Sequence, residues 1–133
     1  MANIVMETNN RRVHLELLDL ASFESIRAFV ARFKSQYKRL DILVNNAGLS
    51  MEKLTFTTDQ IETTFGVNHL GPFLLTNLLL DLLNSTPHSR IVNVSSVVHY
   101  CNLDFQLPNL LGKIQSRKFS DFIYRCQNGL GRH

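Results

Sequence analysis

The sequence is poor in cysteine. Only Cys101 and Cys126 occur in 133 residues, and their spacing matches neither a metal-binding motif nor a disulfide framework. The pair therefore suits a reducing compartment, and we expect no metal site.

Charge is also sparse. Charged residues make up 19% of the chain and the formal net charge is +3, with part of the excess in residues 101–133. A nucleic-acid-binding surface typically makes about six to ten phosphate contacts from a basic stripe. No such stripe is present, so we expect no nucleic-acid partner and interpret 101–133 as a solvated, irregular basic tail.

Long hydrophobic runs are absent as well. The most apolar block, 70–83, is too short to span a bilayer and is interrupted by Thr76, Asn77 and Asp81. Residues 1–7 have neither the basic flank nor the apolar centre of a secretory signal. We therefore expect no membrane segment in this chain.

The hydrophobic content of 44% is nevertheless typical of a globular domain. After a disordered start at 1–12, patterns of apolar residues predict three strands alternating with two helices: strands 13–17, 41–46 and 90–95, and helices 23–37 and 60–83. Phe23, Ile26, Val30 and Phe33 form the expected inward face of the first helix. The order β-α-β-α-β favours an α/β fold with parallel strands.

Local signals mark where the helices begin. Ser22 is a typical N-cap for the first helix. Asp59 and Glu62 have the spacing of a capping pair for the second helix. Gly71 and Pro72 predict a bend inside it.

Two of the predicted strands end in polar residues. Asn45-Asn46-Ala47-Gly48 follows one apolar run, and Asn93-Val94-Ser95-Ser96 follows another. Because the carboxyl ends of parallel strands meet at one edge of a sheet, these two segments predict a common ligand crevice.

These segments also carry a resemblance. Together with Val67-Asn68-His69-Leu70-Gly71 they resemble, in order and spacing, the short-chain dehydrogenase/reductase family. The sequence of 71–80 is similar to that of its retinol dehydrogenase-like branch. The resemblance covers about 13–100. It implies a partial Rossmann-like, doubly wound sheet lacking its first two strands, and NADP or NAD as cofactor. The implied reaction is carbonyl reduction or alcohol oxidation, with retinoid-like small molecules among the substrates that the resemblance implies.

The resemblance implies roles for individual residues. Ser96 matches the serine that holds the substrate oxygen, and Asn68 matches the asparagine that supports a water relay. Asn46, Ala47 and Gly48 match the segment beside the adenosine half of the cofactor, and Asp19 matches a residue that binds the adenine amino group. Each residue also has a plainer interpretation. Ser96 could be a serine at a strand end, and Asn68 a surface residue of a helix. The segment 46–48 could simply form a turn, and Asp19 a turn or a cap.

The chain departs from the family pattern in two places. No glycine occurs in residues 1–12, where a glycine-rich turn for the cofactor pyrophosphate would be sought. The family's catalytic tyrosine has a lysine four residues later, which stabilises the phenolate. Here the tyrosines are followed at that distance by uncharged or acidic residues: Tyr37 by Asp41, Tyr100 by Asp104 and Tyr124 by Asn128. Tyr124 is the best candidate, and we expect this chain to be inactive.

A non-enzymatic alternative remains open. The resemblance places 60–83 on a helix that often forms a dimer interface, so the chain could dock on a full-length dehydrogenase through leucines of this helix. The plainer interpretation is that these leucines cover the sheet. The resemblance also implies an intracellular location, in the cytosol or on the cytosolic face of the endoplasmic reticulum.

Overall fold

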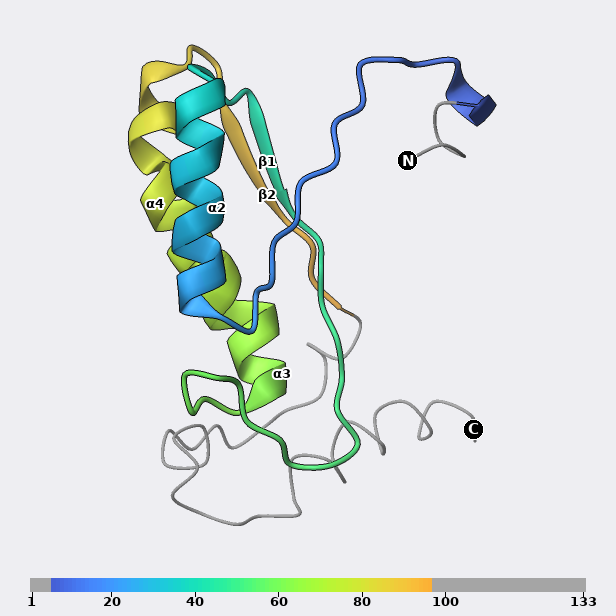
Figure 1. Ribbon diagram of the computed structural model, residues 1–133, viewed down its shortest axis with the longest axis vertical. Helices are drawn as coiled ribbons and strands as arrows, with labels where there is room; N and C mark the ends of the chain where they lie inside the picture. The colour runs from blue at the N-terminus through green and yellow to red at the C-terminus, as the bar shows by residue number, and fades with distance from the viewer. Residues whose placement is uncertain (1–5, 97–133) are drawn as a thin grey trace.

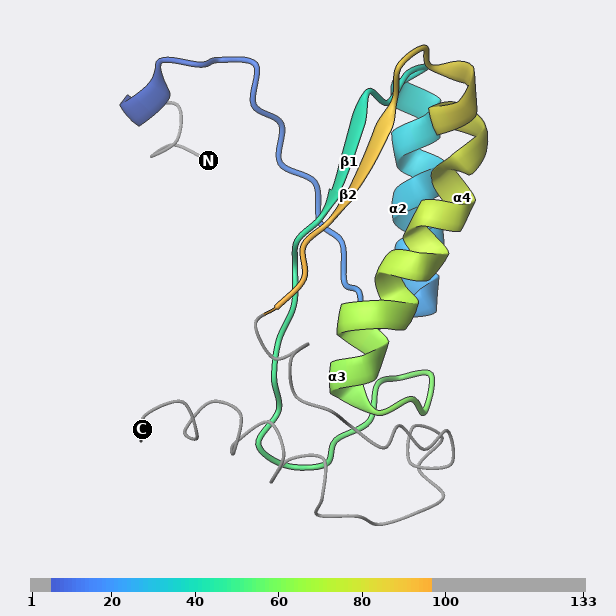
Figure 2. The ribbon, with the colours of Figure 1, turned by 180° about the vertical axis from the view of Figure 1, so that it is seen from behind.

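The computed structural model describes residues 6–96. The elements in chain order are α2 (Phe23–Gln36), β1 (Ile42–Asn45), α3 (Thr63–Phe65), the π-helical turn η1 (Gly66–Leu70), α4 (Gly71–Ser85) and β2 (Arg90–Asn93). Strands β1 and β2 pair in parallel, from Ile42 with Arg90 to Asn45 with Asn93. Helices α2 and α4 lie side by side against this sheet (Figure 1; Figure 2). The predicted α/β class with parallel strands is confirmed.

The predicted strand at 13–17 is wrong. The sheet contains only β1 and β2 among the described residues, and 13–17 belongs to no strand. Leu15 and Leu17 are 69% and 80% exposed. An alternating pattern specifies a strand only when a neighbouring edge supplies backbone partners. Here the side chain of Arg32 takes one of those places, donating a hydrogen bond to the carbonyl of Leu17 at 3.0 Å.

Helix α2 forms as its sequence predicts. Ser22 is the N-cap, and its hydroxyl accepts a hydrogen bond from the Ser25 amide at 3.2 Å. On the inward face Ile26 and Val30 are buried, and Phe23 and Phe33 pack against the same cluster. The helix therefore gains its stability from this apolar stripe more than from helix propensity.

The predicted capping pair is only half right. Glu62 is the N-cap of α3, and its carboxylate accepts from the amides of Thr64 (2.9 Å) and Phe65 (2.7 Å). Asp59 instead accepts from the Phe23 amide at 2.8 Å, at the start of α2. The helix cannot begin near 60 because Gln60 has a φ of 60°, which is left-handed backbone.

Where the sequence predicts a bend at Gly71 and Pro72, the structure has a π-turn, η1, directly before these residues. The Gly71 amide donates to the carbonyl of Gly66, five residues back. A π-turn widens the helix locally, and Pro72, which has no amide hydrogen, lies in the first turn of α4 directly after it. The helix then continues to Ser85.

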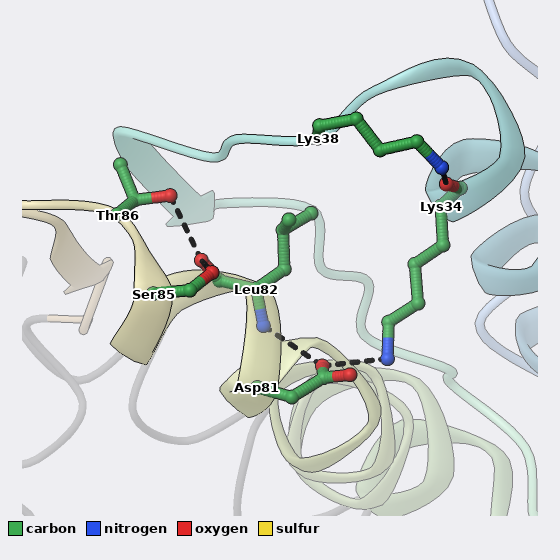
Figure 3. Close-up of polar contacts among 6 residues, drawn as sticks. All are labelled: Lys34, Lys38, Asp81, Leu82, Ser85 and Thr86. Carbon is green, nitrogen blue, oxygen red and sulfur yellow. Dashed lines mark hydrogen bonds and ion pairs between the residues drawn. The ribbon is translucent and has the colours of Figure 1, made fainter.

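The core lies between α2 and α4. Its buried members are Ile26, Val30, Leu75, Leu79 and Leu83, and Leu43 of β1 packs against them. Polar contacts hold the two helices and their connections together (Figure 3). Lys34 of α2 reaches Asp81 of α4 at 2.6 Å, and buried Thr86 donates to the Leu82 carbonyl and accepts from the Leu40 amide.

Candidate functional site

A cleft of about 880 Å³ opens at the carboxyl ends of β1 and β2. It lies where the two polar strand ends predicted a common crevice. It is lined by Asn45, Asn46, Ala47, Gly48, Leu49, Asn68, His69, Pro72, Phe73, Thr76, Ile91, Asn93, Val94, Ser95 and Ser96. The β1 and β2 ends thus form one wall, and the η1–α4 helix forms the other.

An amide network joins the two strands to the helix. The Nδ2 of Asn45 donates to Oδ1 of Asn93 at 2.8 Å and to Oγ1 of Thr76 at 3.1 Å. Asn45 and Asn93 are register partners in the sheet. Sequence reasoning placed Asn45 and Asn93 at the polar strand ends but did not predict this contact or the part of Thr76 in it. The signal was an asparagine at the last position of both strands, where parallel pairing brings side chains together.

Asn68 holds the loop that follows β1. Its Nδ2 donates to the Leu49 carbonyl at 2.7 Å, and its Oδ1 accepts from the Leu49 amide at 2.9 Å. A Cβ added at Gly48 would lie 3.3 Å from Asn68 Oδ1, a tight contact with a side-chain atom. Asn68 lies in the π-turn, a geometry that is frequent at functional sites.

Five of the predicted site residues come together in this cleft: Asn46, Ala47, Gly48, Asn68 and Ser96. They come from segments up to 50 positions apart in the sequence (46 to 96). The roles that the resemblance implies for them stay predictions. Tyr124 and the predicted tail at 101–133 lie outside the described residues.

Asp19 lies elsewhere. It borders a separate depression with Leu15–Leu18, Ser25 and Arg32. Its Oδ1 accepts from the Ala21 amide at 2.8 Å, and its own amide donates to Ser25 Oγ at 3.0 Å. In this structure Asp19 acts as the turn residue that leads into α2.

An aromatic stripe borders the cleft. Sequence reasoning did not predict this stripe. The ring of His69 stacks on Phe65, with centroids 5.1 Å apart, and on Phe73, with centroids 6.4 Å apart. Phe73 is 61% exposed. Aromatic residues spaced four apart on one helix were the available signal.

The cleft lining mixes apolar side chains with amides and hydroxyls, and among residues 6–96 it includes no carboxylate, lysine or arginine. The shifted pKa values belong to groups elsewhere. Hydrogen bonding to Arg39 lowers the pKa of Asp41 and raises that of the guanidinium, at the opposite end of β1. Within residues 6–96, no group of His, Cys, Asp and Glu is arranged to hold a metal ion. The polar groups that the described residues bring to the cleft are amides, hydroxyls and the His69 imidazole, all of which can hydrogen-bond a ligand.

Comparison with known proteins identifies the class. Residues 1–104 match the short chain dehydrogenase family, so the chain belongs to that family. Within it, the sequence falls in the retinol dehydrogenase-like branch. Retinol dehydrogenase 13 from Homo sapiens is 46% identical over 125 residues, which cover 93% of this chain and 37% of the human protein. Retinol dehydrogenase 11 from Homo sapiens is 50% identical over 93 residues, covering 70% of this chain and 29% of that protein.

The fold agrees with solved structures of the family. An NADPH-bound carbonyl reductase from chicken fatty liver superposes with a TM-score of 0.58 at 19% identity, covering 95% of this chain and 55% of that chain. At that identity the likeness concerns the fold alone. The chain spans less than two-fifths of the length of the two retinol dehydrogenases. None of the helices described for 6–96 has the length and apolar character needed to cross a bilayer.

Proposed function

We propose that this chain carries the central part of the cofactor and substrate crevice of an NAD(P)-dependent oxidoreductase that interconverts alcohols and carbonyls. The observation that supports this most is the convergence of Asn46–Gly48, Asn68 and Ser96 on one cleft at the carboxyl ends of parallel strands. The identity to retinol dehydrogenases favours apolar, retinoid-like substrates.

The lining suits only part of a nicotinamide cofactor. The uncharged amides and hydroxyls of the cleft fit a carboxamide and a substrate oxygen. A pyrophosphate needs a glycine-rich turn with free backbone amides or a cation, and neither occurs among the described residues that line this cleft. When bound, a nicotinamide cofactor supplies or accepts the hydride.

The proposed roles of the residues follow from their positions. Ser96 would hold the substrate oxygen by a hydrogen bond from its hydroxyl. Asn68 would position the Asn46–Gly48 loop, because both polar atoms of its amide are engaged by Leu49. Asp19 stands apart from the cleft, so a contact with the adenine end is a proposal that rests on the resemblance alone, as is the role of Tyr124.

We propose further that the 133-residue chain has no turnover by itself. It contains no tyrosine followed four residues later by lysine, so no phenolate would be stabilised for proton transfer near neutral pH. NADPH oxidation by the purified chain should equal the blank with retinal as the probe carbonyl. Turnover that scales with chain concentration would contradict this proposal.

Thermal melting with NADPH and NADH tests cofactor binding separately. A ligand that binds only the folded state raises the melting temperature. We expect no shift from either cofactor, because residues 6–96 provide no glycine-rich turn or cation in the cleft for the pyrophosphate. A concentration-dependent rise would mean that the crevice binds the cofactor in this chain as it stands.

A chimera tests the residues themselves. Residues 13–96 would replace the equivalent segment of human retinol dehydrogenase 13, which supplies the remaining parts of the site. The chimera should reduce retinal, and Ser96→Ala within it should lower kcat/KM by about 10²-fold or more. Ser35→Ala, on the exposed face of α2, is the matched control. An active chimera that is insensitive to Ser96→Ala would refute the role of this serine.

The alternative function, docking on a full-length dehydrogenase through 60–83, has one supporting observation. Phe73 and Leu80 of α4 are 61% and 36% exposed. Leu79 and Leu83 are both 2% exposed in the core cluster, so these two leucines are not available for docking. A pull-down of human retinol dehydrogenase 13 should fail with Phe73→Asp/Leu80→Asp if this helix docks. Leu54→Asp, exposed on a loop, should leave it unchanged.

A further inference from the structure

Three polar residues interrupt the apolar run 70–83: Thr76, Asn77 and Asp81. The Asn77 side chain donates to a carbonyl one turn earlier within α4, and Asp81 binds Lys34 of α2. Of these three residues, Thr76 is the one that lines the cleft. Its hydroxyl therefore serves the cleft, while the other two side chains serve the helix and its contact with α2.

The Thr76 hydroxyl accepts a hydrogen bond from the side-chain amide of Asn45. Nδ2 of Asn45 donates to Thr76 Oγ1 at 3.1 Å and to Asn93 Oδ1 at 2.8 Å. Thr76 and Asn45 are both half-buried. Because both amide hydrogens are used, one toward α4 and one toward β2, the rotation of the Asn45 side chain is fixed. This amide thus joins the helix wall of the cleft to its strand wall.

The same asparagine also holds the end of β2 through its backbone. The Asn45 carbonyl accepts from the Val94 amide at 3.0 Å. Asn45 and Asn93 are the last register pair of the sheet, and Ser96 follows Val94 by two residues. Contacts of Asn45 therefore act on the position of Ser96 relative to β1.

We propose that Thr76 is a positioning residue for the reaction, acting on Ser96 through Asn45. Its hydroxyl orients the Asn45 amide, which in turn holds the end of β2, so the Ser96 hydroxyl is presented at a fixed place in the cleft. The inference rests on the proposed function, because it requires Ser96 to hold the substrate oxygen. Valine has nearly the shape of threonine but no hydroxyl, so Thr76→Val leaves one hydrogen of the Asn45 amide without its acceptor.

Hydrogen exchange by NMR in the 133-residue chain tests the first step. Thr76→Val should raise the exchange rate of the Val94 amide about tenfold, because the end of β2 is held less firmly to β1 and opens more often. Thr76→Ser keeps the hydroxyl and should leave the rate unchanged. Thr55→Val is the matched control. It removes the 2.8 Å hydrogen bond from half-buried Thr55 to Thr63 Oγ1, outside the cleft lining, and should not affect Val94.

Kinetics of the chimera with human retinol dehydrogenase 13 test the second step. A displaced Ser96 would bind the substrate oxygen less well in the transition state, so Thr76→Val should lower kcat for retinal about tenfold while KM changes little. Thr76→Ser should restore kcat, and Thr55→Val should leave it unchanged. The melting temperature is measured alongside, because a purely structural role would lower the folded fraction without changing kcat per folded molecule.

Three outcomes would overturn the inference. The first is unchanged Val94 exchange in Thr76→Val, which would mean that the hydroxyl does not hold the end of β2. The second is an active chimera whose kcat per folded molecule is unchanged by Thr76→Val. The third is an equal loss of kcat in Thr76→Ser and Thr76→Val, which would exclude the hydroxyl as the cause. An inactive chimera would instead contradict the proposed function, and Val94 exchange then still decides whether Thr76 holds the strand end.

Discussion

The two faces of the small sheet have opposite characters. On the helix face, Leu43 packs into a cluster in which Ile26, Leu79 and Leu83 are almost completely buried. On the other face, Ile42, Val44 and Val92 are 57%, 54% and 43% exposed. Both faces carry apolar side chains, but only those on the helix face are buried and stabilise the fold. Parallel sheets are normally covered on both faces. Here α2 and α4 cover one face, and the apolar side chains on the other face remain exposed.

The largest expected effect is a cavity on the buried side. Leu79→Ala should lower the free energy of unfolding by about 2 to 5 kcal/mol, because neighbouring side chains cannot fully collapse into the space. Urea unfolding followed by circular dichroism measures it. Val92→Ala, on the open face, should change stability by about 0.5 kcal/mol or less. Equal losses at the two sites would remove the contrast between the faces.

Gly71→Ala should be next. A Cβ there would lie 2.6 Å from the Leu20 carbonyl oxygen and 3.1 Å from the Leu20 Cβ. Because backbone must move, we expect a loss of about 1 to 3 kcal/mol. Gly48→Ala is the control: its Cβ would meet a side-chain atom, Asn68 Oδ1, at 3.3 Å. A stabilising Gly71→Ala would show that α4 and the segment before α2 are not in close contact.

Asn68→Ala should act locally. It removes both hydrogen bonds to Leu49, so the Leu49 amide should exchange with solvent faster while stability falls by about 1 kcal/mol. Hydrogen exchange by NMR reads the amide directly. Asn77→Ala, which removes only a bond to the Phe73 carbonyl within α4, should leave Leu49 unchanged. Unchanged Leu49 protection in Asn68→Ala would mean that the loop is held by other contacts.

The smallest effect is electrostatic. A hydrogen bond from Lys34 lowers the pKa of Asp81, and the Leu82 amide adds to it. A carboxyl with a lowered pKa stabilises the fold above its unfolded pKa, and this contribution is lost as pH falls through the folded value. Asp81→Asn and Lys34→Met should each flatten this acid-side decline, measured by urea midpoints across pH. The effect should shrink in high salt because both groups are on the surface.

The first helix and the polar strand ends could be predicted from sequence. Ser22 and the Ile26–Val30 stripe define α2 by local rules, and the Asn45 and Asn93 positions follow from apolar runs that end abruptly. The start of the second helix could not be predicted, because the Asp59 carboxylate accepts a hydrogen bond from the Phe23 amide, 36 residues away in the sequence. A capping pattern describes local geometry only. It does not show which of two nearby carboxylates caps the helix and which binds a backbone amide in another part of the fold.

The sequence by itself determined the order of the helical and strand regions from 23 to 93, since periodicity and capping act over a few residues, but not the π-turn within the second helical region. It also determined that polar groups follow both strands. Only the tertiary structure decided that 13–17 has no strand neighbour, that Leu79 and Leu83 face α2, and that Asn68 binds Leu49. Those outcomes depend on which surfaces meet, and contacts between distant segments are set by the packing of the whole fold.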